Sequence, residues 1–474
     1  MRRQRRLRAA VPPRKALCYG NCALQTYPSE DRMLPLYIDG SPEFEAALSA
    51  LCARGATDLA AVEPAVREIL TGVRGGGRAA VLGYVERFER RTPAALVRPA
   101  GPSADGGFGG AEALARMEPG LRAALELAAA RIARYHERQR PAEAGFHYEE
   151  DGVELGMRVS PLGRVGVYAP GGKARYPSSV LMSAIPARVA GVPEIVLATP
   201  SPDDVTLAAA HLAGVSELLD AGGAHAVGAL AYGLEDLKPV DKIVGPGGSY
   251  VACAKRLVYG DVDIDSIAGP SEILVIADES ADPRLCAAEL LAQAEHDEVS
   301  YALLLTTSRA LAEAAAREIA AALPGLSRRE IIEASLRAHG AALVVADRAR
   351  LAAVADAIAA EHVAFQVADP DALLAEVGSL GAALLGQMTP VSAGDYLAGP
   401  SHVLPTGGGA RFGAPLGVYD FVRRSSVIRY SEAALRAHGP AIQAIATAEG
   451  LTAHARAVSI RLEGGNVNGG GSKS

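Results

Sequence analysis

Residues 164–198 read RVGVYAPGGKARYPSSVLMSAIPARVAGVPEIVLA, and this stretch decides the fold class. Two short apolar runs, at 164–168 and 194–198, flank a segment at 177–190 that we expect to be helical. A strand, a helix and a second strand in this order form a βαβ unit, in which the crossover makes the strands parallel. The stretch therefore predicts a parallel sheet covered by helices.

The same alternation continues on the C-terminal side. We expect further strands at 217–220 and 241–244, with a helix at about 205–213. After Ser271 the sequence predicts strands at 272–276, 302–306 and 341–346, with helices at about 283–295, 309–322 and 348–360. Repeated alternation indicates an α/β protein with two Rossmann-like, three-layer domains.

Helical patterns dominate both flanks of these domains. Apolar residues recur at helical spacing in 44–52 and 121–138, the glycine- and proline-rich stretch 101–110 is expected to be a loop, and 431–462 is expected to be helical. The expected divisions are an extension at 1–32, a helical N-terminal region at 33–150, a first Rossmann-like domain at 151–270, a second at 271–412, a helical C-terminal tail at 413–463 and a disordered end at 464–474.

Composition narrows the class of protein. The 474 residues carry a formal net charge of −7, which argues against nucleic-acid binding, because that function needs a basic face. The five cysteines are odd in number and irregularly spaced, so we expect no disulfide framework and a reducing, cytoplasmic compartment. No apolar run reaches the 18 or so residues that a membrane span requires.

The first residues differ in composition from the rest. Residues 1–15 contain seven basic residues and no acidic one. An organelle transit peptide has this charge pattern, but it is also rich in serine, and no serine precedes Ser29. The other interpretation, a disordered extension or an upstream start codon with Met33 as the true start, is the one that we favour.

Candidate ligands and acid/base groups occur in several separate segments. Gln293 and His296 share a helix face at i and i+3, and an amide oxygen with an imidazole nitrogen makes half of a zinc site. The adjacent Glu361 and His362 are the two commonest kinds of general acid/base group, and we expect them at the end of a helix. Asp395 is expected in a loop after a strand. A helix-end histidine or a turn aspartate is the ordinary alternative for each residue taken alone.

A glycine-rich turn suggests a nucleotide. Gly245, Gly247 and Gly248 follow an expected strand and open an expected helix, which is the setting of a phosphate-binding turn. The spacing is not G-x-G-x-x-G, so this signal is weak. Together these segments indicate a metal-dependent α/β enzyme with a candidate nucleotide site.

Several longer strings give a more specific result, because in their order and composition they resemble the histidinol dehydrogenase family. These strings are VYAPGG (167–172), YPSSVLM (176–182), AGPSE (268–272), QAEHD (293–297), AGDY (393–396), HVLPTGG (402–408) and EGLTAH (449–454). The resemblance runs from about residue 34 to residue 462. It implies two Rossmann-like domains without the usual glycine fingerprint, which agrees with the missing G-x-G-x-x-G.

The resemblance also implies a function. Members of the family oxidise L-histidinol to L-histidine through the aldehyde, the last steps of histidine biosynthesis, using two NAD molecules in succession and one zinc ion per site. They are homodimers with an active site shared between subunits. The substrate is a small molecule, and neither nucleic acid nor a membrane is a partner.

Residue by residue, the resemblance implies roles for the matching positions. Glu361 and His362 match the acid/base pair, with His362 also touching substrate. The implied zinc ligands are Gln293, His296, Asp395 and His454, the last of which reaches the metal of the other subunit; all four also lie at the substrate. Further substrate-contacting positions are Ser271, Glu449, Ser178 and His402, and Tyr168 matches a nucleotide contact.

Two positions depart from the family pattern. His225 stands where the family has glutamine and Gly248 where it has asparagine, both at nucleotide-contact positions. These departures change the expected cofactor contacts, whereas the expected zinc ligands and acid/base residues are intact. Two alternatives therefore stay open: a paralogous zinc and NAD dehydrogenase acting on another small polyol, such as a sulfonated diol, and a non-catalytic homologue. The carboxylate of Glu449 favours a cationic substrate over a sulfonate.

Overall fold

The computed structural model describes residues 33–54, 59–140, 144–171 and 176–463. The expectations for 1–32 and 464–474 lie outside these residues, as does Gly172. The chain divides into two compact units. Of the described residues, unit 1 comprises those in 33–54, 269–391 and 405–413, and unit 2 comprises those in 59–268, 392–404 and 414–463. This division differs from the expected domain boundaries, because residues 33–54 join the second sheet instead of a separate helical region.

Unit 2 contains a six-stranded sheet in the order β2-β7-β6-β5-β8-β9, in which only β2 is antiparallel to its neighbour. Its strands are β2 (Val97–Pro99), β5 (Arg164–Tyr168), β6 (Glu194–Ala198), β7 (Glu217–Leu219), β8 (Lys242–Val244) and β9 (Asp263–Ile264). The helices are α2 (Glu63–Tyr84), a π-helical turn (Val85–Glu89), α3 (Gly110–Arg116), α4 (Pro119–Glu137), α5 (Pro177–Ala190), α6 (Asp204–Ala213), α7 (Gly223–Tyr232) and α8 (Ser249–Val258).

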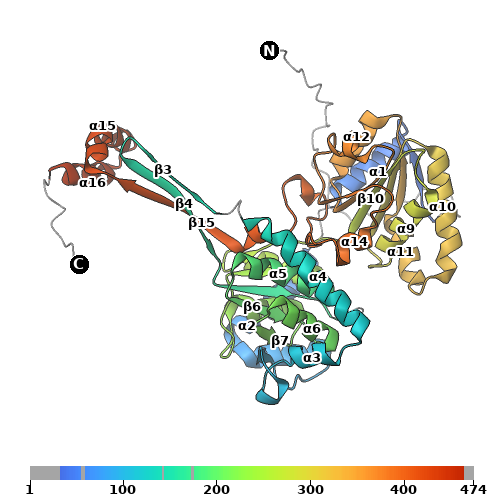
Figure 1. Ribbon diagram of the computed structural model, residues 1–474, viewed down its shortest axis with the longest axis horizontal. Coiled ribbons are helices and arrows are strands. Elements are labelled where there is room, and N and C mark those ends of the chain that lie inside the picture. Colours follow the sequence, from blue (N-terminus) through green and yellow to red (C-terminus); the bar gives the residue numbers. More distant parts are fainter. Residues whose placement is uncertain (1–32, 55–58, 141–143, 172–175, 464–474) are drawn as a thin grey trace, which may run out of the picture. The chain divides into compact units, whose positions relative to one another are not determined.

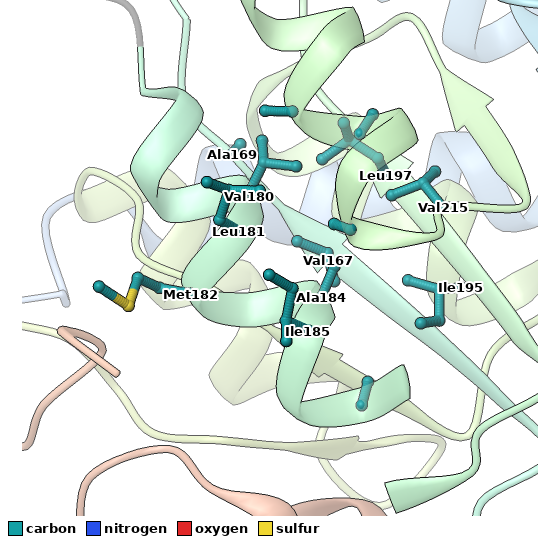
Figure 2. Close-up of a cluster of buried hydrophobic side chains, with 14 of the residues drawn as sticks. Val167, Ala169, Val180, Leu181, Met182, Ala184, Ile185, Ile195, Leu197 and Val215 are labelled. Atoms are coloured by element: carbon teal, nitrogen blue, oxygen red, sulfur yellow. The ribbon is translucent and has the colours of Figure 1, made fainter. Parts of the chain in front are cut away.

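The pleat of the central strand explains the three layers of unit 2. Val165 and Val167 of β5 point to one face, where they meet α5 side chains such as Val180 and Ala184, as Figure 2 shows. Tyr168 points to the other face, into the core formed with α2, α7 and α8. Gly166 lies under α7, because a Cβ there would meet a Leu230 methyl at 2.9 Å. The βαβ unit expected from residues 164–198 is confirmed.

A three-stranded antiparallel sheet also belongs to unit 2. It consists of β3 (Phe146–Glu150), β4 (Val153–Pro161) and β15 (Val422–Tyr430), in the order β15-β4-β3. Helices α15 (Glu432–Ala448) and α16 (Thr452–Glu463) follow at its outer end, beside the β3–β4 turn at Gly152 (Figure 1). We call this sheet and its two helices the arm. The arm strands were not expected from the sequence, whereas both helices were.

Unit 1 contains a six-stranded parallel sheet in the order β1-β12-β11-β10-β13-β14. Its strands are β1 (Leu36–Ile38), β10 (Glu272–Ala277), β11 (Tyr301–Thr306), β12 (Ala341–Val344), β13 (His362–Gln366) and β14 (Ala382–Leu385). The helices are α1 (Pro42–Ala53), α9 (Pro283–Ala294), α10 (Arg309–Ala322), α11 (Arg329–His339), α12 (Arg348–Ile358), α13 (Pro370–Leu374) and α14 (Val391–Tyr396), the last of which leads into unit 2.

Both faces of the unit 1 sheet are covered. Alternate residues of β10 enter two cores: Ile273 and Val275 face α9, α10 and α11, whereas Leu274 and Ile276 face α1 and α12. Strands buried on both faces read as continuous apolar runs, which is why their positions could be predicted. The α/β class with two parallel-sheet units is confirmed. Among the described residues, no helix combines the length and the apolar character that a membrane span requires.

Candidate active site

Glu361 and His362 lie at the start of a strand, not at the end of a helix, so that expectation was wrong. Helix α12 ends at Ile358 and is closed by Ala359, whose φ of 49° is left-handed. His362 is the first residue of β13, and it pairs in register with Ile273 of β10. The apolar run that follows His362 pairs with two neighbouring strands, and this tertiary pairing decides the conformation.

The main chain of Glu272 fixes both side chains. Its N–H donates to Oε2 of Glu361 at 2.8 Å, and its carbonyl accepts from Nδ1 of His362 at 3.3 Å. Glu361 and His362 are each 6% exposed, and Nδ1 of His362 lies 3.8 Å from Oε2 of Glu361. Because Nδ1 carries the proton, Nε2 of the neutral ring is its proton-accepting nitrogen. The pair is thus a carboxylate and an oriented imidazole side by side.

Gln293 and His296 meet at the C-terminal end of α9. Gln293 lies in the last turn, and the N–H of His296 donates to the carbonyl of Gln293 at 3.2 Å, so the expected i and i+3 proximity is present. The amide Oε1 and Nε2 of Gln293 and Nδ1 of His296 are buried with no hydrogen-bond partner. Orphaned buried polar atoms are costly, and a metal ion would satisfy an amide oxygen and an imidazole nitrogen. These two side chains fit a zinc site.

The unit 1 residues share one edge of the sheet. Ser271 immediately precedes β10, His362 begins β13, and α9 runs back to the amino ends of the strands. Ligand sites of open α/β sheets ordinarily lie at the carboxyl edge. Here the candidate chemistry lies at the amino edge, so the strand-end rule could not have located it.

Asp395 and His402 are brought together in unit 2. Asp395 lies in the short helix α14 instead of the expected loop. Nδ1 of His402 donates to the Asp395 carbonyl at 2.9 Å, and the Ser179 hydroxyl donates to Nε2 of the same ring at 3.3 Å. Ser178, the predicted substrate contact, is the neighbour of Ser179 at the N-terminus of α5 and is half-buried. A buried Ser401 hydroxyl bonded to the Met182 carbonyl at 3.1 Å holds this loop on α5.

Glu449 and His454 lie in a different part of unit 2. Both are exposed, at the end of α15 and the start of α16 in the arm. The nine residues of β15 separate these helices from the turn that packs on α5. At about 3.3 Å per residue, that strand spans roughly 25–30 Å. Within one chain, therefore, Glu449 and His454 do not join Asp395 and His402.

The expected ligands do not form a cluster within either unit. Among the described residues, no three His, Cys, Asp or Glu side chains gather in a way that could hold a metal ion. Gln293 and His296 belong to unit 1, whereas Asp395 and His454 belong to unit 2. The roles predicted for these residues remain predictions.

Tyr168 and His225 form part of a network beneath a glycine turn. The Tyr168 hydroxyl accepts from the Gly223 N–H at 3.0 Å, and burial raises the pKa of this phenol. Nε2 of His225 lies 3.1 Å from Oε1 of Glu89, which also accepts from the Gly222 N–H at 2.9 Å. His225 is buried, so it supports the turn from below.

The second glycine turn opens α8, as expected. Gly248 caps this ten-residue helix without a side-chain hydrogen bond. Gly245 adopts a φ of 107°, and a Cβ there would meet the Tyr168 carbonyl oxygen at 2.1 Å, so only glycine fits. Lys255 and Asp265 anchor the turn: the lysine donates to the Gly245 carbonyl at 3.0 Å, and the aspartate accepts from the Gly245 N–H at 2.7 Å. A helix N-terminus opened by glycines fits the phosphates of a dinucleotide.

Comparisons with known proteins agree with these features. The sequence model described as histidinol dehydrogenase matches residues 52–462. The histidinol dehydrogenase of Syntrophotalea carbinolica is 48% identical over 436 residues, covering 91% of this chain and 100% of that protein. That of Aquifex aeolicus is 49% identical over 401 residues, covering 84% of this chain and 92% of the relative. A crystal structure of histidinol dehydrogenase from Elizabethkingia anophelis superposes with a TM-score of 0.83 at 31% identity, covering 91% of this chain and 99% of that one.

Proposed function

Because this chain belongs to the histidinol dehydrogenase family, we propose that it oxidises L-histidinol to L-histidine through L-histidinaldehyde, with two NAD molecules as successive hydride acceptors and one zinc ion per site. The observation that carries this proposal is the Glu361–His362 pair, whose two side chains are fixed by the main-chain N–H and C=O of one β10 residue, Glu272. A carboxylate beside an oriented imidazole supplies the two proton transfers that alcohol and aldehyde oxidation need.

The two side chains take different parts. Nε2 of His362 removes the hydroxyl proton of L-histidinol as hydride leaves the carbon. The Glu361 carboxylate takes a proton from the water that adds to the aldehyde, and His362 then removes a hydroxyl proton of the hydrate. The sum is one histidinol, two NAD⁺ and one water giving histidine, two NADH and three protons. Burial of both groups limits the loss of the bound aldehyde to side reactions.

The zinc ion would be held by Gln293, His296, Asp395 and the partner subunit's His454. When bound, it would orient the substrate through neutral amine and imidazole nitrogens, which are good zinc ligands. The orphaned atoms of Gln293 and His296 support this ligand set.

The remaining site residues would select the substrate and the cofactor. Glu449 offers a carboxylate to a cationic nitrogen of histidinol, and Ser271, Ser178 and His402 offer polar contacts. For the cofactor we propose Tyr168 and the Gly245–Gly248 turn. Since Gly248 has no side chain, the cofactor loses one amide contact there.

We further propose a homodimer with an active site shared between subunits. The arm exposes large apolar side chains, among them Phe146 at 57%, Ile428 at 66% and Ile445 at 63%. Several large apolar side chains exposed on one part of a fold are typical of a protein interface. The distance along β15 between His454 and Asp395 supports donation of His454 to a second chain.

The test is a turnover assay with zinc-loaded protein, L-histidinol and NAD. Two NADH per histidinol, with histidine as the product, would support the proposal. Reduction of NAD with another small polyol but not with histidinol would favour a paralogous dehydrogenase. Bound zinc without any NADH formation would favour a non-catalytic homologue.

A further inference from the structure

Arg54 and Glu272 form a fully buried ion pair in unit 1, and sequence analysis gave neither a role. Nε and Nη2 of Arg54 donate to the two carboxylate oxygens of Glu272 at 2.8 and 2.6 Å, a bidentate geometry. The side chains are 1% and 0% exposed. Nη1 of Arg54 donates to the Leu51 carbonyl at 2.6 Å, which ties the guanidinium to the end of α1. The two residues are 218 positions apart, so only the fold joins them.

The same carboxylate holds two further pieces of backbone. Oε1 of Glu272 accepts from the Gly407 N–H at 2.8 Å, and Oε2 accepts from the Glu361 N–H at 3.3 Å. Four donors therefore converge on one carboxylate, which fixes its position. Gly407 belongs to the string 402–408 that resembles the family, and Glu361 is the proposed base.

The main chain of Glu272 in turn contacts the acid/base pair: its N–H donates to Glu361 and its carbonyl accepts from His362, as described above. We propose that the Arg54–Glu272 ion pair is a positioning element: it fixes residue 272, and residue 272 aims Glu361 and His362. This inference rests on the proposed function of Glu361 and His362. Arg54 and Glu272 act through these two residues.

The connection on the Arg54 side is also rigid. Helix α1 packs on α12 through Phe44 and Leu51, in a core that continues into β13. Arg54 is thus held relative to the strand that begins with His362. The guanidinium also neutralises Glu272, whose carboxylate would otherwise place a second negative charge beside Glu361.

The first variant to make is Glu272→Gln, because the amide keeps the shape but loses the charge and the paired acceptors. We expect kcat for L-histidinaldehyde oxidation to fall about 10- to 100-fold, as displacements near 1 Å at reacting groups do. KM for the aldehyde and for NAD should stay within about threefold, because positioning acts on the transition state.

A double variant separates positioning from stability. Glu272→Gln alone leaves the Arg54 charge buried and unpaired, which destabilises a protein strongly. Arg54→Met combined with Glu272→Gln removes both charges, so the melting temperature should recover. If the pair positions the site, kcat stays low in the double variant; recovery of kcat together with stability would overturn the inference. Glu217→Gln is the control, since it breaks an ion pair with Arg164 that joins the first residues of β7 and β5 in unit 2.

The pH dependence gives a second readout. Among the described residues, the titratable side chain beside Glu361 is His362 on β13, and the charged side chains one step further are Glu272 on β10, which accepts from the Glu361 N–H, and Arg54 after α1, which pairs with Glu272. Arg54→Met leaves a negative Glu272 beside Glu361, which should move the acidic limb of the kcat profile to higher pH. Glu272→Gln leaves a positive Arg54 and should move it to lower pH. Equal profiles in both variants would contradict the placement of this ion pair next to Glu361, on which the inference depends.

A crystal structure of the Glu272→Gln variant needs no turnover. We expect the distance from the residue 272 nitrogen to Glu361 Oε2 to exceed 3.5 Å, compared with 2.8 Å in the parent protein. An unchanged distance would overturn the inference. A parent protein without histidinol turnover would refute the proposed function, whereas an active parent whose variants keep full kcat would refute only the positioning role.

Discussion

Replacement of Glu361 by glutamine should reduce catalysis far more than stability. The amide is isosteric, and its oxygen can still accept the Glu272 N–H that Oε2 of Glu361 accepts at 2.8 Å. A hydrogen bond to a charged group contributes about 1.5–3 kcal/mol and a neutral one about 0.5–1.5 kcal/mol, so the unfolding free energy should fall by about 1 kcal/mol. The fold and the neighbouring His362 should therefore stay in place.

The chemical loss is larger. General base catalysis contributes about 10²- to 10⁴-fold, which is about 2.7–5.4 kcal/mol of barrier. Because Glu361 is assigned to the water that attacks the aldehyde, aldehyde oxidation should fall by this factor. Alcohol oxidation, which depends on His362, should fall less than about tenfold.

The assay is single-turnover stopped flow, which resolves the first NADH from the second, with zinc content and thermal unfolding measured on the same samples. Asp356→Asn is the control, because Asp356 accepts the N–H groups of Gly378 and Ser379 at 2.7 and 2.8 Å and lies on the helix before Glu361. A Glu361→Gln protein that loses zinc and both oxidation steps equally would make Glu361 structural. A normal second step would show that Glu361 is not the base.

Four other changes have defined expectations. Gly248→Asn should increase the affinity for NAD about 2- to 12-fold in a binding titration, because one hydrogen bond contributes about 0.5–1.5 kcal/mol. The φ of −64° at Gly248 and the open space around its Cβ position admit the asparagine side chain. An unchanged affinity would argue against a cofactor contact at this position. Gln293→Leu should lower the amount of bound zinc, measured by mass spectrometry. In chelator-treated protein the same change should raise the unfolding free energy by about 1–3 kcal/mol, because it removes two buried polar atoms that have no hydrogen-bond partner. A metal-free variant less stable than the metal-free parent would contradict this expectation. Ile428→Glu should weaken the dimer at least about 100-fold in analytical ultracentrifugation, since an unpaired charge would be buried; an unaltered sedimentation profile would exclude this part of the arm from the interface. Burial alone would raise the pKa of Glu89, but hydrogen bonds from His225, the Gly222 N–H and Arg91 outweigh this effect and lower the pKa. The stability that Glu89 adds is therefore complete above its ordinary pKa and is lost as the pH falls through the lowered value. Denaturant titrations of the parent protein and of Glu89→Gln should converge in acid, and a constant difference between their unfolding free energies would refute this contribution.

The spacing of apolar residues in the sequence correctly predicted those strands and helices whose conformation depends on nearby residues. The strand at 164–168 and the helix at 177–190 have the predicted bounds, because a strand buried on both faces must be apolar throughout and Pro177 begins the helix. Glu361 and His362 were assigned to a helix end instead, because Ala359 closes α12 in a left-handed conformation that alanine rarely adopts. The conformation of that segment was decided by the pairing of β13 with β10, which is far away in the chain.

The arm shows the same limit. Strand β15 was included in a helical tail, although Ser426, Val427 and Ile428 lie within an extended nine-residue run. Its partner β4 is about 270 residues earlier, as the register of Arg429 with Glu154 shows. No local pattern encodes such a pairing, and the exposed apolar residues of the sheet do not alternate cleanly.

By itself, the sequence determined the α/β class and the presence of candidate ligand and acid/base side chains, because apolar period and side-chain type are local properties. The roles of Glu361 and His362 and the full ligand set came from the resemblance of several strings to one family. Only the tertiary structure decided that the unit 1 residues share the amino edge of the sheet. Only it joined Arg54 to Glu272 and brought the main-chain N–H and C=O of Glu272 to the side chains of Glu361 and His362. The physical reason is that hydrogen bonds and ion pairs of this kind depend on distances of about 3 Å between residues that lie 89 to 218 positions apart. Only the packing of helices and strands fixes such distances.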